Sequence, residues 1–185
     1  MQKYLFALMA LLMLSACSLR KPDYPPPAET IENFFMYIGN EEYTEAQNLL
    51  YSGMVLPFYE IEEEFRAAFK NISFDIISEE IYEDEASVLI NISAIDFSAV
   101  MEDILQEAFY WIFEGITEAE LTSRITDTLF ERILSDTVPV TENYITITLR
   151  LDDGEWKIVA DGLFTDAITG GMVSFAEYAG QWVTE

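Results

Sequence analysis

The order of hydrophobic patterns along the chain predicts an α+β fold, in which helices cover one face of a curved antiparallel sheet of about four strands. Apolar residues first recur every three or four positions, then alternate with polar residues, then return to helical spacing and finally alternate again. Each alternating region contains a turn sequence, which is typical of a β-hairpin. This order indicates N-terminal helices, followed by a helical pair inserted between two hairpins.

Helices are predicted before the first hairpin and after the last. The first, at residues 28–38, ends at Gly39-Asn40, and shorter helices follow at 41–51 and 60–69. A single helical turn is predicted at 164–169, and no element is assigned beyond it. The apolar stripe of the first helix consists of Ile31, Phe34, Phe35 and Ile38.

The two hairpins are predicted from strict alternation of apolar and polar residues. The first joins residues 72–76 to 88–93 through an acidic turn, and the second joins 144–151 to 156–160. The second turn is Asp152-Asp153-Gly154, whose residues favour the backbone conformations of a tight hairpin. We expect Trp156 to belong to the core.

The helical pair between the hairpins has clear boundaries. Residues 97–114 form a long amphipathic pattern that Gly115 ends. Thr117 followed by Glu120 is a capping-box sequence, in which each residue satisfies a backbone donor of the other, so a second helix is predicted from there to about Leu134.

The first residues have the features of a bacterial export signal. Lys3 precedes an apolar run of eleven residues, which is shorter than the roughly 20 needed to span a membrane. The following Leu14-Ser15-Ala16-Cys17 resembles the lipobox of bacterial lipoproteins, in which the cysteine receives a diacylglyceryl group and signal peptidase II cuts before it. Residues 1–16 are therefore predicted to be a cleaved lipoprotein signal peptide and Cys17 to carry the lipid, palmitate-type chains included. An ordinary secretory signal or a buried helix are the alternatives.

The predicted mature chain has a short basic N-terminal segment followed by an acidic domain. Residues 17–27 form a proline-rich tether with Arg20 and Lys21 beside the lipid, and residues 28–185 form one domain. That domain holds 33 acidic and 6 basic residues. The lipobox predicts that the protein lies on the extracytoplasmic face of a cell membrane. The charge predicts that an anionic bilayer repels its acidic domain.

Composition excludes several functions. The 185 residues include no histidine, which removes the Ser-His-Asp triad, the Cys-His pair and histidine-ligated zinc. The formal charge of −25 disfavours binding to nucleic acid, because phosphates would be repelled. The acidic runs lack the ligand spacing of calcium loops, so neither a metal site nor a cofactor is expected.

Three segments resemble a known family. Residues 28–35 (AETIENFF), 41–46 (EEYTEA) and 153–158 (DGEWKI) are similar to small bacterial lipoproteins of the NTF2-like superfamily, uncharacterised domains of the DUF4878 or DUF5105 kind. The resemblance spans about residues 28–170. It implies a cone, in which a curved sheet wrapped by helices surrounds a cavity, and Trp156 anchoring the final hairpin.

Enzymes of that superfamily, such as ketosteroid isomerase, use a carboxylate in an apolar pocket beside a tyrosine or a protonated acid. No segment here carries the matching residues, so no catalytic residue is transferred and the protein is expected not to be an enzyme. The acids that fall in or beside strand patterns, and the tyrosines that would assist them, are Asp75, Asp96, Asp161, Tyr59, Tyr110 and Tyr144.

Aromatic residues give the other hint of a site. Phe109, Tyr110, Trp111 and Phe113 are too close together on one helix to share one side. Either this helix is buried on both sides, or Trp111 covers a ligand cavity or a partner surface. Trp111, Tyr110 and Asp161 are the candidate pocket residues.

The sequence therefore predicts a lipid-anchored binding module for a small apolar ligand, a peptide or an envelope protein. The alternative is a pocket enzyme of the ketosteroid-isomerase type that uses carboxylate and tyrosine groups.

Overall fold

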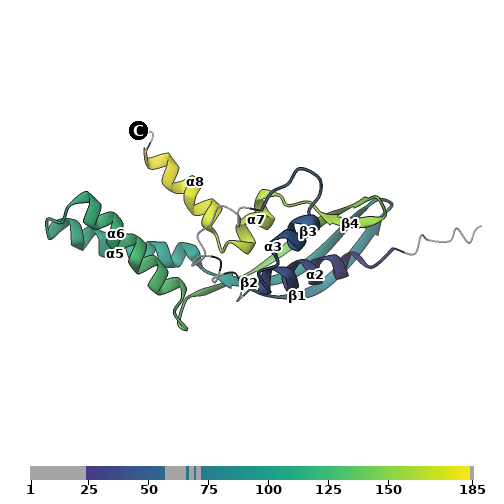
Figure 1. Ribbon diagram of the computed structural model, residues 1–185, viewed down its shortest axis with the longest axis horizontal. Helices are drawn as coiled ribbons and strands as arrows, with labels where there is room; N and C mark the ends of the chain where they lie inside the picture. Colours follow the sequence, from purple (N-terminus) through teal and green to yellow (C-terminus); the bar gives the residue numbers. More distant parts are fainter. Residues whose placement is uncertain (1–23, 57–65, 67–68, 70–71, 184–185) are drawn as a thin grey trace, which may run out of the picture.

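The computed structural model describes residues 24–56, 66, 69 and 72–183, with side chains described up to residue 178. The predicted signal peptide, Cys17, most of the tether, Tyr59 and all of the predicted helix at 60–69 except residues 66 and 69 lie outside these residues. The described part folds as a cone with a helical hairpin projecting from one end (Figure 1).

Four antiparallel strands form one sheet in the order β1-β2-β3-β4, which confirms the predicted α+β class. The strands are β1 (Ser73–Tyr82), β2 (Glu85–Ile95), β3 (Val140–Asp152) and β4 (Glu155–Ile158). The two predicted hairpins join because β2 pairs with β3 along its whole length, from Glu85 opposite Arg150 to Ile95 opposite Val140.

Tight turns close both hairpins. Asp153 and Gly154 have φ of 48° and 87°, the left-handed conformation that the predicted Asp-Gly turn requires. Glu83 has φ of 54° in the turn between β1 and β2.

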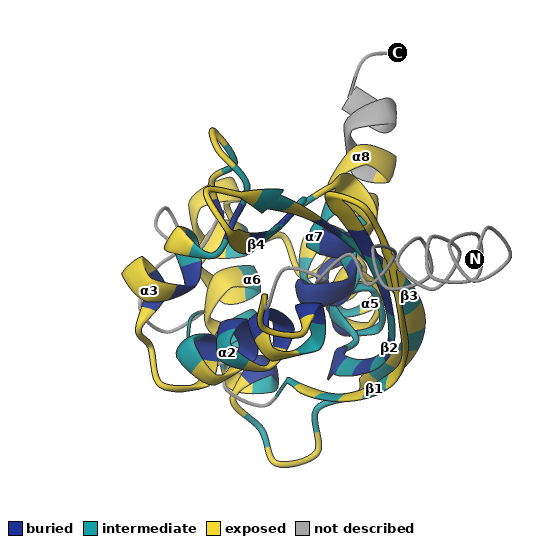
Figure 2. Cartoon of the chain, turned by 90° about the vertical axis from the view of Figure 1, so that its right-hand side faces the viewer, coloured by how far each residue is buried: buried dark blue, intermediate teal, exposed yellow. Residues whose placement is uncertain are grey.

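Helices close the concave side of the sheet, as seen along the cone in Figure 2. They are α2 (Pro27–Gly39), α3 (Tyr43–Asn48) and α7 (Gly162–Ile168). Pro27 occupies the first turn of α2, where its missing N–H costs no hydrogen bond. The second predicted helix is shorter than expected.

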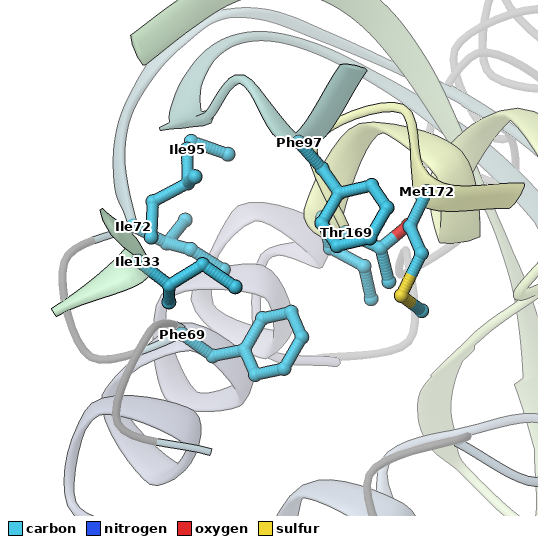
Figure 3. A pocket seen from close by; sticks show the side chains of 9 residues that line it. Phe69, Ile72, Ile95, Phe97, Ile133, Thr169 and Met172 are labelled. Atoms are coloured by element: carbon cyan, nitrogen blue, oxygen red, sulfur yellow. The ribbon is translucent and has the colours of Figure 1, made fainter. Parts of the chain in front are cut away.

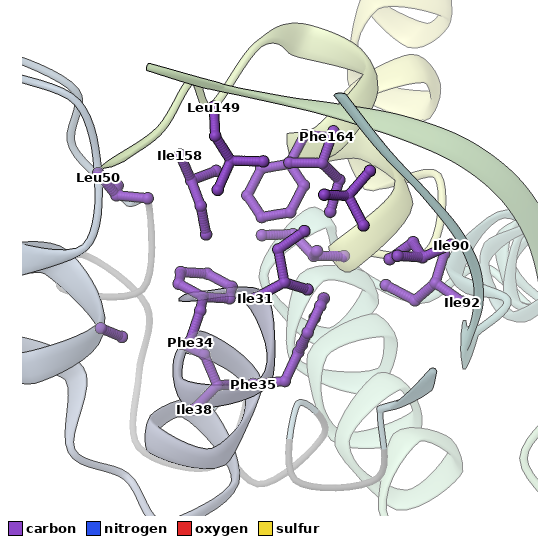
Figure 4. Packing of buried hydrophobic residues seen from close by; sticks show 14 of the residues in the cluster. Ile31, Phe34, Phe35, Ile38, Leu50, Ile90, Ile92, Leu149, Ile158 and Phe164 are labelled. Atoms are coloured by element: carbon purple, nitrogen blue, oxygen red, sulfur yellow. The ribbon is translucent and has the colours of Figure 1, made fainter. Parts of the chain in front are cut away.

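The core lies between α2, α7 and the concave face of the sheet (Figure 4). Every second residue of β2 points into it, from Ala86 to Ala94. Phe34 is fully buried, with its ring 5.3 Å from that of Phe35 and 5.5 Å from that of Phe164. Trp156 is buried, as predicted.

The predicted helical pair is present as α5 (Phe97–Phe113) and α6 (Glu118–Ile133). The capping box is formed: the Thr117 backbone N–H donates to a Glu120 carboxylate oxygen at 3.0 Å, and the Glu120 N–H donates to the Thr117 hydroxyl oxygen at 3.3 Å. A small cluster of buried residues joins the two helices at their base: Val100, Ile104 and Ile133.

The last helix, α8 (Met172–Val183), was not predicted from the sequence. It follows two glycines that fit closely against the junction of β2 and α5. Gly170 has φ of 62°, and a Cβ added to it would lie 1.6 Å from the carbonyl oxygen of Ile95. Its own carbonyl oxygen accepts a hydrogen bond of 2.9 Å from the N–H of Phe97.

Candidate functional site

The candidate pocket residues lie in two separate parts of the molecule. Tyr110 and Trp111 are on the outer half of α5, whereas Asp161 stands at the start of α7 in the cone. Trp111 is half-buried beneath the guanidinium of Arg124, whose central carbon lies 6.0 Å from the ring centroid. These three residues do not form one pocket.

Two of the candidate acids cap helices. The Asp96 carboxylate accepts a 2.9 Å hydrogen bond from the Ala99 N–H at the start of α5. The Asp161 carboxylate accepts one of 2.8 Å from the Phe164 N–H at the start of α7. Asp75 and Tyr144 are exposed on strands β1 and β3. The caps account for the position of Asp96 and Asp161 without a catalytic role.

An apolar cavity lies where the cone meets the base of the hairpin (Figure 3). Its volume is about 20 Å³, and its lining includes Phe69, Ile95, Phe97, Ile133 and Met172. A space of that size holds about one water molecule, whereas ligand pockets are roughly 300–1,000 Å³. The side chains that line it therefore leave no room for a small organic molecule.

The outer half of α5 exposes a continuous group of large apolar side chains. Phe113 is 87% exposed, Tyr110 72% and Phe109 65%. The group, here called the hairpin surface, comprises Leu105, Phe109, Tyr110, Ile112 and Phe113. Helical spacing puts four of them on one side of α5, with Tyr110 beside them. The expectation that this helix is buried on both sides is wrong, because α6 covers only one side.

The helical hairpin that carries this surface is acidic. Residues 97–134 contain eight acidic and two basic residues. Both bases are paired inside the hairpin: Arg124 contacts Glu114 at 3.3 Å, and Arg132 contacts Asp103 at 3.4 Å and also Glu107. The hairpin therefore presents an apolar stripe with an excess of negative charge.

The hairpin of α5 and α6 lies at the opposite end of the molecule from the start of α2 (Figure 1). Tyr24, the first described residue, is seven residues from Cys17. Seven residues span at most about 25 Å when fully extended. A lipid on Cys17 would thus lie within about 25 Å of Tyr24, at the end of the cone where α2 begins.

Within the described residues, no group of three or more acidic or cysteine side chains is placed to hold a metal ion. None of the described helices combines the length and apolarity needed to cross a bilayer.

Comparison with known proteins gives one family match. Residues 1–18 match the prokaryotic membrane lipoprotein lipid attachment site. The chain carries a lipoprotein attachment site. This confirms the lipobox prediction, and the match includes Cys17, the residue predicted to be lipidated.

Among solved structures, the chain is similar to YcdA, a protein of Bacillus subtilis whose crystal structure is described as that of a lipoprotein. The two are 13% identical with a TM-score of 0.44, over 78% of this chain and 46% of YcdA. This lipoprotein thus spans about half the length of its neighbour. No curated protein matches the sequence.

Proposed function

We propose that this lipoprotein is a non-catalytic binding module on the extracytoplasmic face of the membrane, and that it binds an envelope protein through the hairpin surface. The observation that carries the proposal is the exposure of five large apolar side chains on one projecting helix. Large exposed apolar patches on soluble domains mark interaction sites, and aromatic side chains supply much of the binding energy at protein interfaces.

The chemistry of the hairpin defines the partner. An apolar stripe beside unpaired carboxylates fits a partner segment that carries apolar residues flanked by lysine or arginine. The nearly filled cavity favours surface contact over uptake of a small apolar ligand.

The lipid anchor is tested by Cys17→Ala, with Ser18→Ala as the matched control. We expect the cysteine variant to leave the membrane fraction and the serine variant to remain in it, because several acyl chains are needed for stable anchoring. Full membrane retention of Cys17→Ala would contradict the anchor.

The hairpin surface is tested by photocrosslinking in cells. A benzophenone side chain placed at Tyr110 should give a discrete protein adduct that disappears when Phe109 and Phe113 are both changed to serine. The matched control changes Ile77 and Ile81, two exposed apolar residues of β1, to serine. Equal loss in both double variants would contradict a specific surface.

A further inference from the structure

Strand β3 has an edge that no described strand covers. It runs for 13 residues, but β4 has only four and pairs with β3 from Leu149 to Asp152. The chain then turns away, because the Asp161 N–H donates to the Val159 carbonyl oxygen and the Asp161 carboxylate caps α7. Among the described residues, no strand pairs with the rest of β3 on this side.

Backbone hydrogen bonds at the two ends of β3 fix which backbone groups point out from this edge. The Leu151 N–H donates to the Asp84 carbonyl oxygen, and the Pro139 carbonyl oxygen accepts from the Asp96 N–H, so odd-numbered residues of β3 face β2. The Thr148 carbonyl oxygen accepts from the Val159 N–H, so even-numbered residues face the other way. Backbone groups alternate in direction along a strand. The N–H and C=O groups of Glu142, Tyr144 and Thr146 therefore point outward.

A hollow lies beside this edge. Its volume is about 450 Å³, within the range of ligand pockets. One wall consists of β3 residues 141, 143, 144 and 145, and the opposite wall of residues from α7 and the start of α8, including Leu163, Asp166 and Ser174. Asp96 also lines it, and none of its lining residues is basic.

We propose that this edge binds an extended peptide with basic side chains, which adds to the sheet as a fifth strand. Peptide residues opposite Glu142, Tyr144 and Thr146 would exchange backbone hydrogen bonds with them. Alternate peptide residues, opposite Thr141, Asn143 and Ile145, would direct their side chains into the hollow. There Asp96 and Asp166 favour lysine or arginine.

The occupant is a basic segment of another protein. A second copy of this chain pairing edge to edge is disfavoured, since residues 28–185 carry 33 acidic and 6 basic residues. The site is separate from the hairpin surface, and its binding does not depend on the function proposed above.

The test uses the full-length lipoprotein in detergent and a fluorescent peptide of alternating lysine and threonine. We expect saturable binding by anisotropy, together with slower hydrogen exchange in residues 142–146. In the proposed register the threonine amides face β3 and the lysine amides face away. N-methylation of the threonine amides should weaken binding by at least about tenfold, and N-methylation of the lysine amides by much less.

Two further measurements test the charge preference of the site and the role of the strand edge. Replacing lysine by glutamate in the peptide should weaken binding by about tenfold or more. The protein variant Tyr144→Pro removes one outward N–H at an edge position that tolerates proline, and it should also weaken binding. The variant Phe113→Ser should bind the peptide normally.

Equal binding of the two N-methylated peptides would overturn the proposal, even if Tyr144→Pro failed to fold. Undetectable binding at millimolar peptide, equal binding of the glutamate peptide, or an edge-to-edge dimer in sedimentation would also overturn it.

Discussion

The cone and the helical hairpin both contain helices with apolar residues at helical spacing, but the two regions are stabilised very differently. In the described part of the chain, the core of the cone contains twenty buried residues, which come from α2, α3, α7, nearby loops and strands β2, β3 and β4. Residues of β1 pack at its margin. The buried cluster of the hairpin consists of Val100, Ile104 and Ile133, and the outer half of α5 is exposed. Most of the folding stability is therefore expected to come from the cone, whereas the hairpin presents an exposed apolar surface.

The largest effect is expected from Phe34→Ala in the core of the cone. Phe34 is fully buried against Phe35 and Phe164, so its removal should lower the free energy of unfolding by about 3–5 kcal/mol. Urea denaturation measures the loss. The matched variant Phe113→Ala, at an 87% exposed position, should change stability by less than about 0.5 kcal/mol. Similar losses in both variants would remove the distinction between the two regions.

The junction between the regions is tested by Gly170→Ala. A Cβ there would meet the Ile95 carbonyl oxygen at 1.6 Å, and φ is 62°, so the backbone must shift. We expect a loss of about 2–3 kcal/mol in thermal or urea unfolding. The control is Gly39→Ala, since nothing lies within 4 Å of the added Cβ. An unchanged Gly170 variant would mean that this contact does not hold the junction.

Ile104→Ala tests the small cluster at the base of the hairpin. Ile104 is fully buried, and its truncation should cost about 2 kcal/mol, with faster hydrogen exchange in α5 and α6 than in the strands. Ile112→Ala on the same helix is the control, because Ile112 is 53% exposed and its loss should have little effect. Faster exchange across the whole sheet would show that the hairpin and cone unfold together.

The smallest effect is a pH dependence at the start of α6. Hydrogen bonds from the Thr117 backbone N–H and hydroxyl lower the pKa of Glu120 below its ordinary value of 4.5. The folded pKa is lower than the unfolded one, so the stabilisation is fully present above about pH 4.5 and is lost as the pH falls through the folded pKa.

Comparing Glu120→Gln with the wild-type chain isolates this contribution. We expect amides in the first turn of α6 to exchange faster in the variant at pH 7, and equally in both proteins once the pH is below the folded pKa of Glu120 and its carboxyl group is neutral. If the difference in exchange rate persists at acidic pH, the effect comes from the shape of the side chain rather than from its charge.

Local sequence signals predicted much of the fold. The capping box at Thr117 and the Asp153-Gly154 turn are formed, and alternation located all four strands. Strand length was underestimated, because Ser78–Tyr82 of β1 is exposed and its strand structure depends on pairing with β2 rather than on a buried face. An exposed strand shows no alternation of buried and exposed residues, even where its partner is close in sequence.

The candidate site was harder to predict for a related reason. Apolar periodicity in residues 97–114 identifies a helix, but it does not show how many sides of that helix pack against other elements. Leu105 and Ile104 look equally suited to a core, yet only Ile104 is buried. The open edge of β3 likewise depends on where β4 ends, which the Asp161 cap decides.

The two ends of the hairpin insertion lie next to each other. Ile95 is paired with Val140, and the Asp96 N–H donates to the Pro139 carbonyl oxygen at 2.8 Å. A loop of two to five residues is enough to join neighbouring antiparallel strands. Residues 97–138 thus form an insertion between two paired strand ends, and a short loop in its place would leave the strand order of the sheet unchanged. Such an arrangement would allow the hairpin to change in length or sequence without a change in the sheet that carries it.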